Sequence, residues 1–218
     1  MKGILFTESM FNAVINGTKT QTRRIMKPQP KDIEQGWFDG INLDDCPYCG
    51  NNGIWYLNSF GVESAQPRYK VGEKVYLKEE FCFDGIIKNL IYYKYDNLDW
   101  RDLPTYPRWK NKIFMPEKYA RYFIEITGVR CERLQDISDE DCLKEGVYPH
   151  RVFVPKINDY ALLYHFSPEL ERKEMRGYCN ARQAYAALID KINGKGTWES
   201  NPYVWVYDFK LVNNNKNE

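Results

Sequence analysis

The chain has few histidines, no long apolar run and almost no net charge. Only two of its 218 residues are histidine, and its formal net charge is +1 at pH 7. This balance excludes a domain of very high isoelectric point, so any contact with nucleic acid must come from a local patch. No stretch approaches the length of about 18 consecutive apolar residues that a transmembrane helix needs. We therefore expect a protein that does not span a membrane.

The chain also lacks an apolar leader and a cysteine framework. Glu8 brings a charge close to the N-terminus, so we expect no secretory signal peptide. Without such a signal, scattered cysteines are expected to be reduced thiols rather than disulfides. The six are Cys46, Cys49, Cys82, Cys131, Cys142 and Cys179. We expect a soluble, cytoplasmic protein.

One pair of cysteines has the spacing of half a zinc site. Cys46 and Cys49 are separated by two residues and followed by Gly50. The sequence has no second pair of this kind, and its two histidines, His150 and His165, stand far away along the chain. A turn with two free thiols is the favoured interpretation, and a zinc site is the alternative. We predict no metal and no cofactor.

Acidic residues are missing from one cationic stretch, which organises the rest of the interpretation. Residues 18–31 contain no aspartate or glutamate, and residues 18–24 hold one lysine, two arginines and three threonines. A cationic, hydroxyl-rich loop in a chain of neutral balance indicates an anion or nucleotide site. The competing interpretation is a solvated surface loop.

The flanking pattern places this loop after a helix. Met10, Phe11, Val14 and Ile15 recur at helical spacing, and Gly17 follows as a helix stop. The spacing predicts a helix over residues 8–16. The prolines at 28 and 30 then force an extended exit.

The remaining elements predict a mixed fold. Alternating or β-branched runs predict strands, and capped periodic runs predict helices. The strands are expected at 2–6, 74–81, 90–95, 122–129 and 203–209, and the helices at 138–146 and 180–194. Residues 99–116 are expected to be a long loop, and the prolines within 147–178 argue against long elements there. We predict an α+β fold: a small β-barrel with peripheral short helices, one domain over 1–212, an aromatic and glycine-rich insertion at about 32–70 and a disordered tail at 213–218.

The motif carries a family resemblance. The spacing Gly17-x-Lys19-x-x-Thr22-x-Arg24 resembles the signature of the ASCH domain, and the stretch resembles the start of phage and prophage members. Further similarity lies at residues 27–30, 71–79, 127–130, 133–138, 190–198 and 201–206. The resemblance implies a PUA-like β-barrel and a role linked to RNA, nucleosides or nucleic-acid modification. Nucleosides or nucleic acids are therefore the expected partners.

The threonine within the motif narrows this expectation. Many family members have glutamate where this chain has Thr22. Threonine at this place is similar to compact bacterial members that hydrolyse N4-acetylcytidine to cytidine and acetate. The resemblance implies a catalytic set of Lys19, Thr22 and Glu145. This chain is longer than those enzymes, and its insertions could cap, narrow or replace their pocket.

The residues themselves are suited to amide hydrolysis. A threonine hydroxyl is a poor nucleophile unless a base lies within hydrogen-bond reach, and Lys19 could be that base if burial and nearby cations lower its pKa. Arg23 or Arg24 could hold an oxyanion or a phosphate. Glu145 could pass a proton to the leaving amine.

The competing class is a non-catalytic RNA- or DNA-binding module. In it, Lys19, Arg23 and Arg24 would contact phosphates. Thr22 favours hydrolysis only slightly, so both classes stay open.

Other residues are weaker candidates. Glu79 is a second candidate for the catalytic acid, although a solvated carboxylate is the simpler role. Arg121 is expected either to bind nucleic acid or phosphate in the same cleft or to form a surface salt bridge. His150 is interpreted as a loop residue, and Trp205 and Phe209 as core. The oligomeric state is left open.

Overall fold

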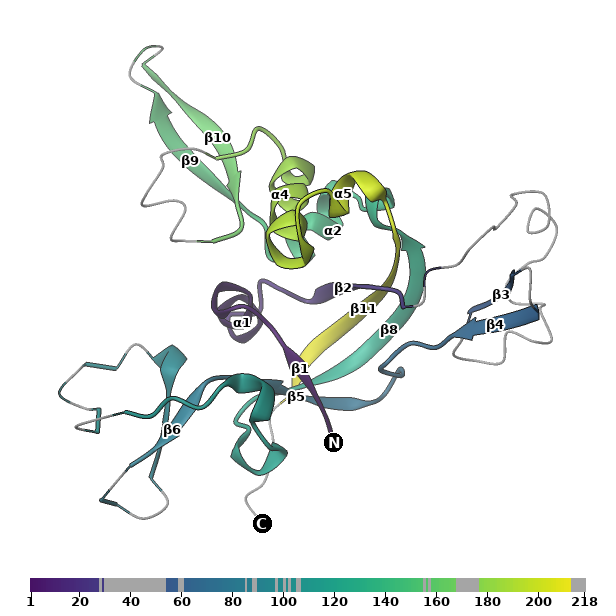
Figure 1. Cartoon of the computed structure of the whole chain (residues 1–218). Coiled ribbons are helices and arrows are strands. Elements are labelled where there is room, and N and C mark those ends of the chain that lie inside the picture. Colours follow the sequence, from purple (N-terminus) through teal and green to yellow (C-terminus); the bar gives the residue numbers. More distant parts are fainter. Residues whose placement is uncertain are drawn as a thin grey trace.

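A curved five-stranded sheet forms the centre of the molecule (Figure 1). The computed structural model describes residues 1–27, 29, 54–58, 61–84, 86–87, 90–96, 98–99, 101, 103–104, 107–154, 156, 158–167 and 177–212. The strand order is β1-β5-β8-β11-β2, and only the β1–β5 pair is parallel. The strands are β1 (Lys2–Leu5), β5 (Lys74–Lys78), β8 (Phe123–Arg133), β11 (Tyr203–Val212) and β2 (Gln21–Ile25).

The sheet is held by alternating apolar side chains on its inner face. Ile124 and Ile126 of β8 and Val75 of β5 have no exposed surface. Burying each of these side chains contributes roughly 1.5–3 kcal/mol. Trp205 and Phe209 of β11 join the same core, as predicted.

A bulge lets the two longest strands curl. The register of β11 against β8 shifts between Asp208 and Phe209, opposite Gly128. Such a bulge bends a strand and increases its twist. Glycine is needed here because a Cβ at 128 would lie 2.8 Å from Oδ2 of Asp208. The long β8 and β11 curve together in Figure 1.

The predicted α+β class is confirmed, but a closed barrel is not. Within the described strands, β1 and β2 are the two edges of the sheet, and no ladder joins them. One side chain spans this seam, since Nη2 of Arg24 donates a hydrogen bond to the Leu5 carbonyl oxygen at 2.6 Å.

Four α-helices with described ends pack around the sheet. They are α1 (Glu8–Ile15), α2 (Asp139–Lys144), α4 (Ala181–Asn193) and α5 (Thr197–Ser200). The first three are capped by Thr7, Ser138 and Asn180, and the side chain of each cap accepts a hydrogen bond from a backbone N–H in the first turn. The predicted helices at 8–16, 138–146 and 180–194 are thus confirmed. In Figure 1, α2, α4 and α5 lie together on one side of the sheet.

Among the described residues, three hairpins lie outside the main sheet. They pair β3 (Ile54–Asn58) with β4 (Gly61–Ala65), β6 (Phe81–Phe83) with β7 (Ile91–Tyr93), and β9 (Tyr148–Val154) with β10 (Asp159–His165). Short 3-10 helices complete the described elements: η2 (Lys94–Asp96), η3 (Lys112–Phe114), η4 (Glu117–Tyr119) and η5 (Leu134–Asp136).

Two of these hairpins correct the sequence analysis. The expectation of no long element within 147–178 is wrong, because β9 and β10 each have seven residues. Pro149 is tolerated because β9 pairs with β10 alone among the described strands, which leaves the other side of β9 without a ladder. The single strand expected over 74–81 ends at Lys78, and Phe81 pairs with Tyr93 in the second hairpin instead.

The cationic stretch is also different from the prediction. Residues 21–25 are not a loop but the edge strand β2, paired with β11 so that Thr22 lies opposite Tyr207 and Arg24 opposite Trp205. The strand pattern was hidden because polar side chains fill its buried positions. Lys19 is 3% exposed and Arg23 is 6% exposed, so the alternative of a solvated surface loop is wrong.

Candidate active site

Backbone hydrogen bonds bring Lys19 to the end of α2. Gly17 stops α1 with a φ of +73°, a conformation that glycine adopts without strain. The amides of Thr18 and Lys19 then turn back to the Ala13 carbonyl oxygen, at 2.9 and 3.0 Å. The amide of Thr20 donates to the Lys144 carbonyl oxygen at 2.9 Å. The segment after α1 is thereby fixed beside the last residue of α2.

Lys19 and Glu145 form a buried ion pair at this junction. Nζ of Lys19 lies 2.6 Å from Oε2 of Glu145 and 2.7 Å from the Glu145 carbonyl oxygen. Each residue is 3% exposed. The structure thus brings together two residues that are 126 positions apart in the sequence.

The surroundings of Lys19 disfavour its charged form. Burial lowers the pKa of Lys19 below its ordinary value, and the charges of Arg24 and Arg23 act in the same direction. The carboxylate of Glu145 opposes this shift but does not cancel it. A lysine with a lowered pKa is more often in the neutral amine form that a general base requires.

Arg23 holds the acidic side of the site in place. Its guanidinium contacts Glu132, Asp141 at 2.9 Å and Glu145 at 3.3 Å. Burial opposes the charge of Arg23, but these carboxylates outweigh it and raise its pKa. Its Nη1 also donates to the side-chain carbonyl oxygen of Gln21. With its donors used in this way, Arg23 positions Glu145 rather than offering a free face to a phosphate.

The bulge supports this network from the sheet. The carboxylate of Asp208 accepts hydrogen bonds from Nε2 of Gln21 and from Nη1 of Arg130, both at 2.7 Å. Nη2 of Arg130 donates in turn to Asp141 at 2.9 Å. Gly128 leaves room for Asp208, and Asp208 holds Gln21 and Arg130. Gln21 accepts a hydrogen bond from Arg23, and Arg130 shares Asp141 with it. Gly128 therefore supports the orientation of Arg23 indirectly.

A small cavity of about 90 Å³ opens beside the ion pair. Thr22, Arg24 and Tyr185 line it together with Lys19 and Glu145. Within the described part of the chain, the hydroxyl of Thr22 has no hydrogen-bond partner, so it is free to meet a bound molecule. The structure thus places the three residues of the implied catalytic set around one cavity.

Tyr185 is a site residue that the sequence analysis missed. It is fully buried on α4, and its hydroxyl has no hydrogen-bond partner among the described residues. Burial raises the pKa of Tyr185, and the nearby charge of Glu145 adds to the shift. The sequence did carry a signal for this residue. Tyr185 stands among alanine and leucine residues in the buried stripe of the helix, and a buried hydroxyl there normally needs a hydrogen-bond partner.

The other candidate residues lie elsewhere. Arg121 is paired with Glu79 and Asp96, each at 2.7 Å, and lines neither cavity described here. Glu79 has no exposed surface, so its interpretation as a solvated carboxylate is wrong. His150 lies on β9 rather than in a loop.

The described residues contain no group that would hold a metal ion. No three or more histidine, cysteine, aspartate or glutamate side chains among them are grouped so that they could hold a metal ion. Cys46 and Cys49 lie outside the described residues. Of the cysteines within them, Cys82, Cys131, Cys142 and Cys179 are free thiols, as predicted.

Comparisons with models of protein families, with curated proteins and with solved structures find no match to this chain. In the described parts of the chain, no helix combines the length and apolar character needed to cross a membrane.

Proposed function

We propose that this protein is an amidohydrolase that removes an acyl group from the exocyclic amine of an N4-acylated cytidine. The observation that carries the proposal is the 2.6 Å contact between Nζ of Lys19 and Oε2 of Glu145, at a cavity that Thr22 also lines. Amide hydrolysis needs a nucleophile, a base and an acid around one reacting bond. Lys19 and Thr22 line the same cavity without a hydrogen bond between them, so the proposed reaction requires Nζ of Lys19 to reach Oγ1 of Thr22 in the substrate complex. The resemblance to the ASCH domain supports the same three residues.

The first half-reaction forms an acyl-enzyme. The ion pair first passes its proton from Nζ of Lys19 to the Glu145 carboxylate. Lys19, now a neutral amine, takes the hydroxyl proton of Thr22 while Oγ1 bonds to the acyl carbon. The bond from carbon to N4 breaks, and Glu145 as the neutral acid gives its proton to the departing amine. Cytidine leaves, with Lys19 protonated and Glu145 ionised.

The second half-reaction restores the enzyme. A water molecule attacks the ester on Thr22, and the Glu145 carboxylate takes the proton of that water. The bond from the acyl carbon to Oγ1 breaks, and Thr22 recovers a proton from Lys19. The carboxylic acid product leaves, the proton on Glu145 passes back to Lys19, and every residue returns to its starting state.

Two further residues support the charge that develops on the acyl oxygen. Arg24 lines the cavity, and no carboxylate of the described residues lies at ion-pair distance from it. Its guanidinium can therefore donate to that oxygen. Tyr185 also lines this cavity, and we propose its unpartnered hydroxyl as a second donor. On the same resemblance, we propose that the open sheet is a variant of the PUA-like barrel whose seam is spanned by Arg24.

The alternative of a binding module has less support. It would use Lys19, Arg23 and Arg24 as a phosphate-binding patch. Lys19 and Arg23 are almost fully buried and are paired with carboxylates. Phosphates of a nucleic acid would have to displace those partners.

Turnover of N4-acetylcytidine tests the proposal. The wild-type protein is expected to release cytidine and acetate, measured by chromatography. Thr22→Val keeps the side-chain shape and removes the nucleophile, so turnover is expected to fall by at least about 100-fold. Thr20→Val is the matched control, because this threonine is exposed and two residues away. Absence of wild-type turnover on N4-acylated cytidines, or full activity of Thr22→Val, would refute the proposal.

Tyr185→Phe tests the second donor. Turnover is expected to fall about tenfold, which corresponds to one lost hydrogen bond of about 1.4 kcal/mol in the transition state. The free energy of unfolding is expected to be unchanged or higher, because the hydroxyl has no partner in the folded protein. Lower stability with unchanged turnover would show that Tyr185 has only a structural role.

A further inference from the structure

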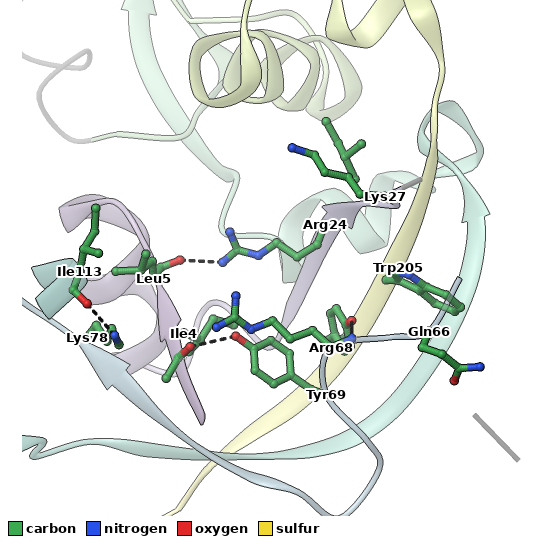
Figure 2. A pocket seen from close by; sticks show the side chains of 13 residues that line it. Ile4, Leu5, Arg24, Lys27, Gln66, Arg68, Tyr69, Lys78, Ile113 and Trp205 are labelled. Atoms are coloured by element: carbon green, nitrogen blue, oxygen red, sulfur yellow. Dashed lines mark hydrogen bonds between the residues drawn. The ribbon is translucent and has the colours of Figure 1, made fainter. Parts of the chain in front are cut away.

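A second cavity lies at the open seam between β1 and β2 (Figure 2). Its volume is about 540 Å³, within the range of roughly 300–1,000 Å³ typical of small-molecule sites. Among the described residues that line it, none is acidic, and its cationic residues are Arg24, Lys27, Arg68 and Lys78. Such a concentration of one charge is unusual in a chain whose formal net charge is +1.

Two arginines at this cavity form no ion pair with the described residues. In the described parts of the chain, neither Arg24 nor Arg68 has a carboxylate at ion-pair distance. Arg24 donates to the Leu5 carbonyl oxygen, and the guanidinium of Arg68 lies 5.5 Å from the centre of the Tyr69 ring. Figure 2 shows the two arginine side chains extending in the same direction across the cavity. Two like charges in this position repel each other unless an anion joins them.

Neighbouring arginines on β2 therefore face opposite environments. Successive side chains of a strand point to opposite faces. Arg23 forms ion pairs with carboxylates, whereas Arg24 forms none with the described residues and lines a cavity with three other cations. Burial lowers the pKa of Arg24; Tyr69 and Glu145 oppose this shift, and the charge of Arg68 adds to it. An anion bound in the cavity would neutralise the charge of Arg24, as the carboxylates neutralise the charge of Arg23.

We propose that this cavity binds the phosphate of a nucleoside monophosphate. The planar guanidinium matches the geometry of phosphate oxygens and can bind them in a bidentate manner. The cavity shares Leu5 and Arg24 with the smaller cavity that contains Lys19 and Thr22. The nucleotide part of this inference rests on the proposed function, because a phosphate held on one side of Arg24 would direct the base to the other side.

A mononucleotide fits better than a nucleic-acid strand. The four cationic residues named above line one cavity. Strand binding depends on neutralising several phosphates in succession. The enzyme would then prefer an N4-acylated cytidine 5′-monophosphate to the free nucleoside.

Calorimetric binding of the reaction products tests the phosphate site without any turnover. Cytidine 5′-monophosphate is expected to bind at least about tenfold more tightly than cytidine, the effect of one charge-assisted bond. Arg68→Gln is expected to remove most of this preference and to leave cytidine binding unchanged. The side chain of Arg68 is exposed, so this change leaves the core intact. Lys74→Gln is the matched control, since it removes one charge from an exposed position outside both cavities.

Two further probes identify the source of the phosphate. Inorganic phosphate is expected to compete with cytidine 5′-monophosphate. A single-stranded pentanucleotide with a central cytidine is expected to bind no more tightly than the mononucleotide. Much tighter binding of the pentanucleotide would overturn the assignment to a mononucleotide, and equal binding of cytidine and its monophosphate would overturn the phosphate site.

The outcomes separate this inference from the proposed function. Hydrolysis of N4-acetylcytidine without any preference for phosphate would refute only the phosphate site. A preference for phosphate that depends on Arg68, without hydrolysis of any N4-acylated substrate, would refute only the amidohydrolase.

Discussion

Replacing Glu145 by glutamine exposes the electrostatic cost of burying Lys19. The substitution keeps the side-chain shape but removes the carboxylate that lies 2.6 Å from Nζ of Lys19. Lys19 is then left buried beside Arg23 and Arg24, both of which lower its pKa. Breaking a buried ion pair in this way costs about 3–5 kcal/mol. The cost has an upper limit because Lys19 can lose its proton.

That upper limit depends on pH in a calculable way. Holding a lysine neutral at pH 7, when its unfolded pKa is about 10.4, costs at most about 4.6 kcal/mol, and the cost falls by about 1.4 kcal/mol per pH unit. Because the pKa of Lys19 is lower in the folded state than in the unfolded state, the unfolded chain binds more protons. Stability of Glu145→Gln therefore rises as pH increases towards the ordinary lysine value.

Urea unfolding followed by tryptophan fluorescence at pH 7, 8 and 9 measures this effect. The stability deficit of Glu145→Gln is expected to shrink between pH 7 and pH 9, by up to about 2.7 kcal/mol. Lys19→Met is the control, because it removes the titrating group while Glu145 keeps Arg23 at 3.3 Å. The stability deficit of Lys19→Met is expected not to shrink between pH 7 and pH 9. A Glu145→Gln deficit that stays constant or grows over this range would refute the reasoning.

Two further predictions concern the support of the site. Gly128→Ala places a Cβ 2.8 Å from Oδ2 of Asp208, so the Asp208 side chain must move away from its hydrogen-bond partners. The free energy of unfolding is therefore expected to fall by about 1–3 kcal/mol. An unchanged urea midpoint would contradict this. Burial raises the pKa of Cys131 and Cys142 to about 12, so iodoacetamide at pH 8 is expected to leave both unmodified in the native protein while the exposed Cys179 reacts. Peptide mass spectrometry measures this, and labelling of Cys142 as fast as Cys179 would contradict it.

Local sequence patterns determined most of the helices. Met10, Phe11 and Val14 repeat at helical spacing, and Gly17 ends the helix where expected. Asn180 is the N-cap of α4, also as expected. These elements were predictable because their signals, periodicity and capping, act within a few residues of the chain.

Buried polar strands were not predictable by the same means. Residues 21–25 carry glutamine, threonine and two arginines, which resemble an exposed loop when they are considered alone. They form a strand because β11 supplies hydrogen bonds and because carboxylates from β8 and α2 neutralise Arg23. Tertiary partners far along the chain therefore decided the local structure.

The sequence by itself determined which residue types are available for chemistry, and the ASCH-like spacing singled out Lys19 and Thr22. The resemblance also implied Glu145, but only the tertiary structure shows its contact with Lys19, 126 positions away. The tertiary structure also decided that Arg23 and Arg24, adjacent in the chain, face opposite charge environments. The physical reason is that ion pairs and cavities depend on distances in space, and these distances are set by how the strands pair.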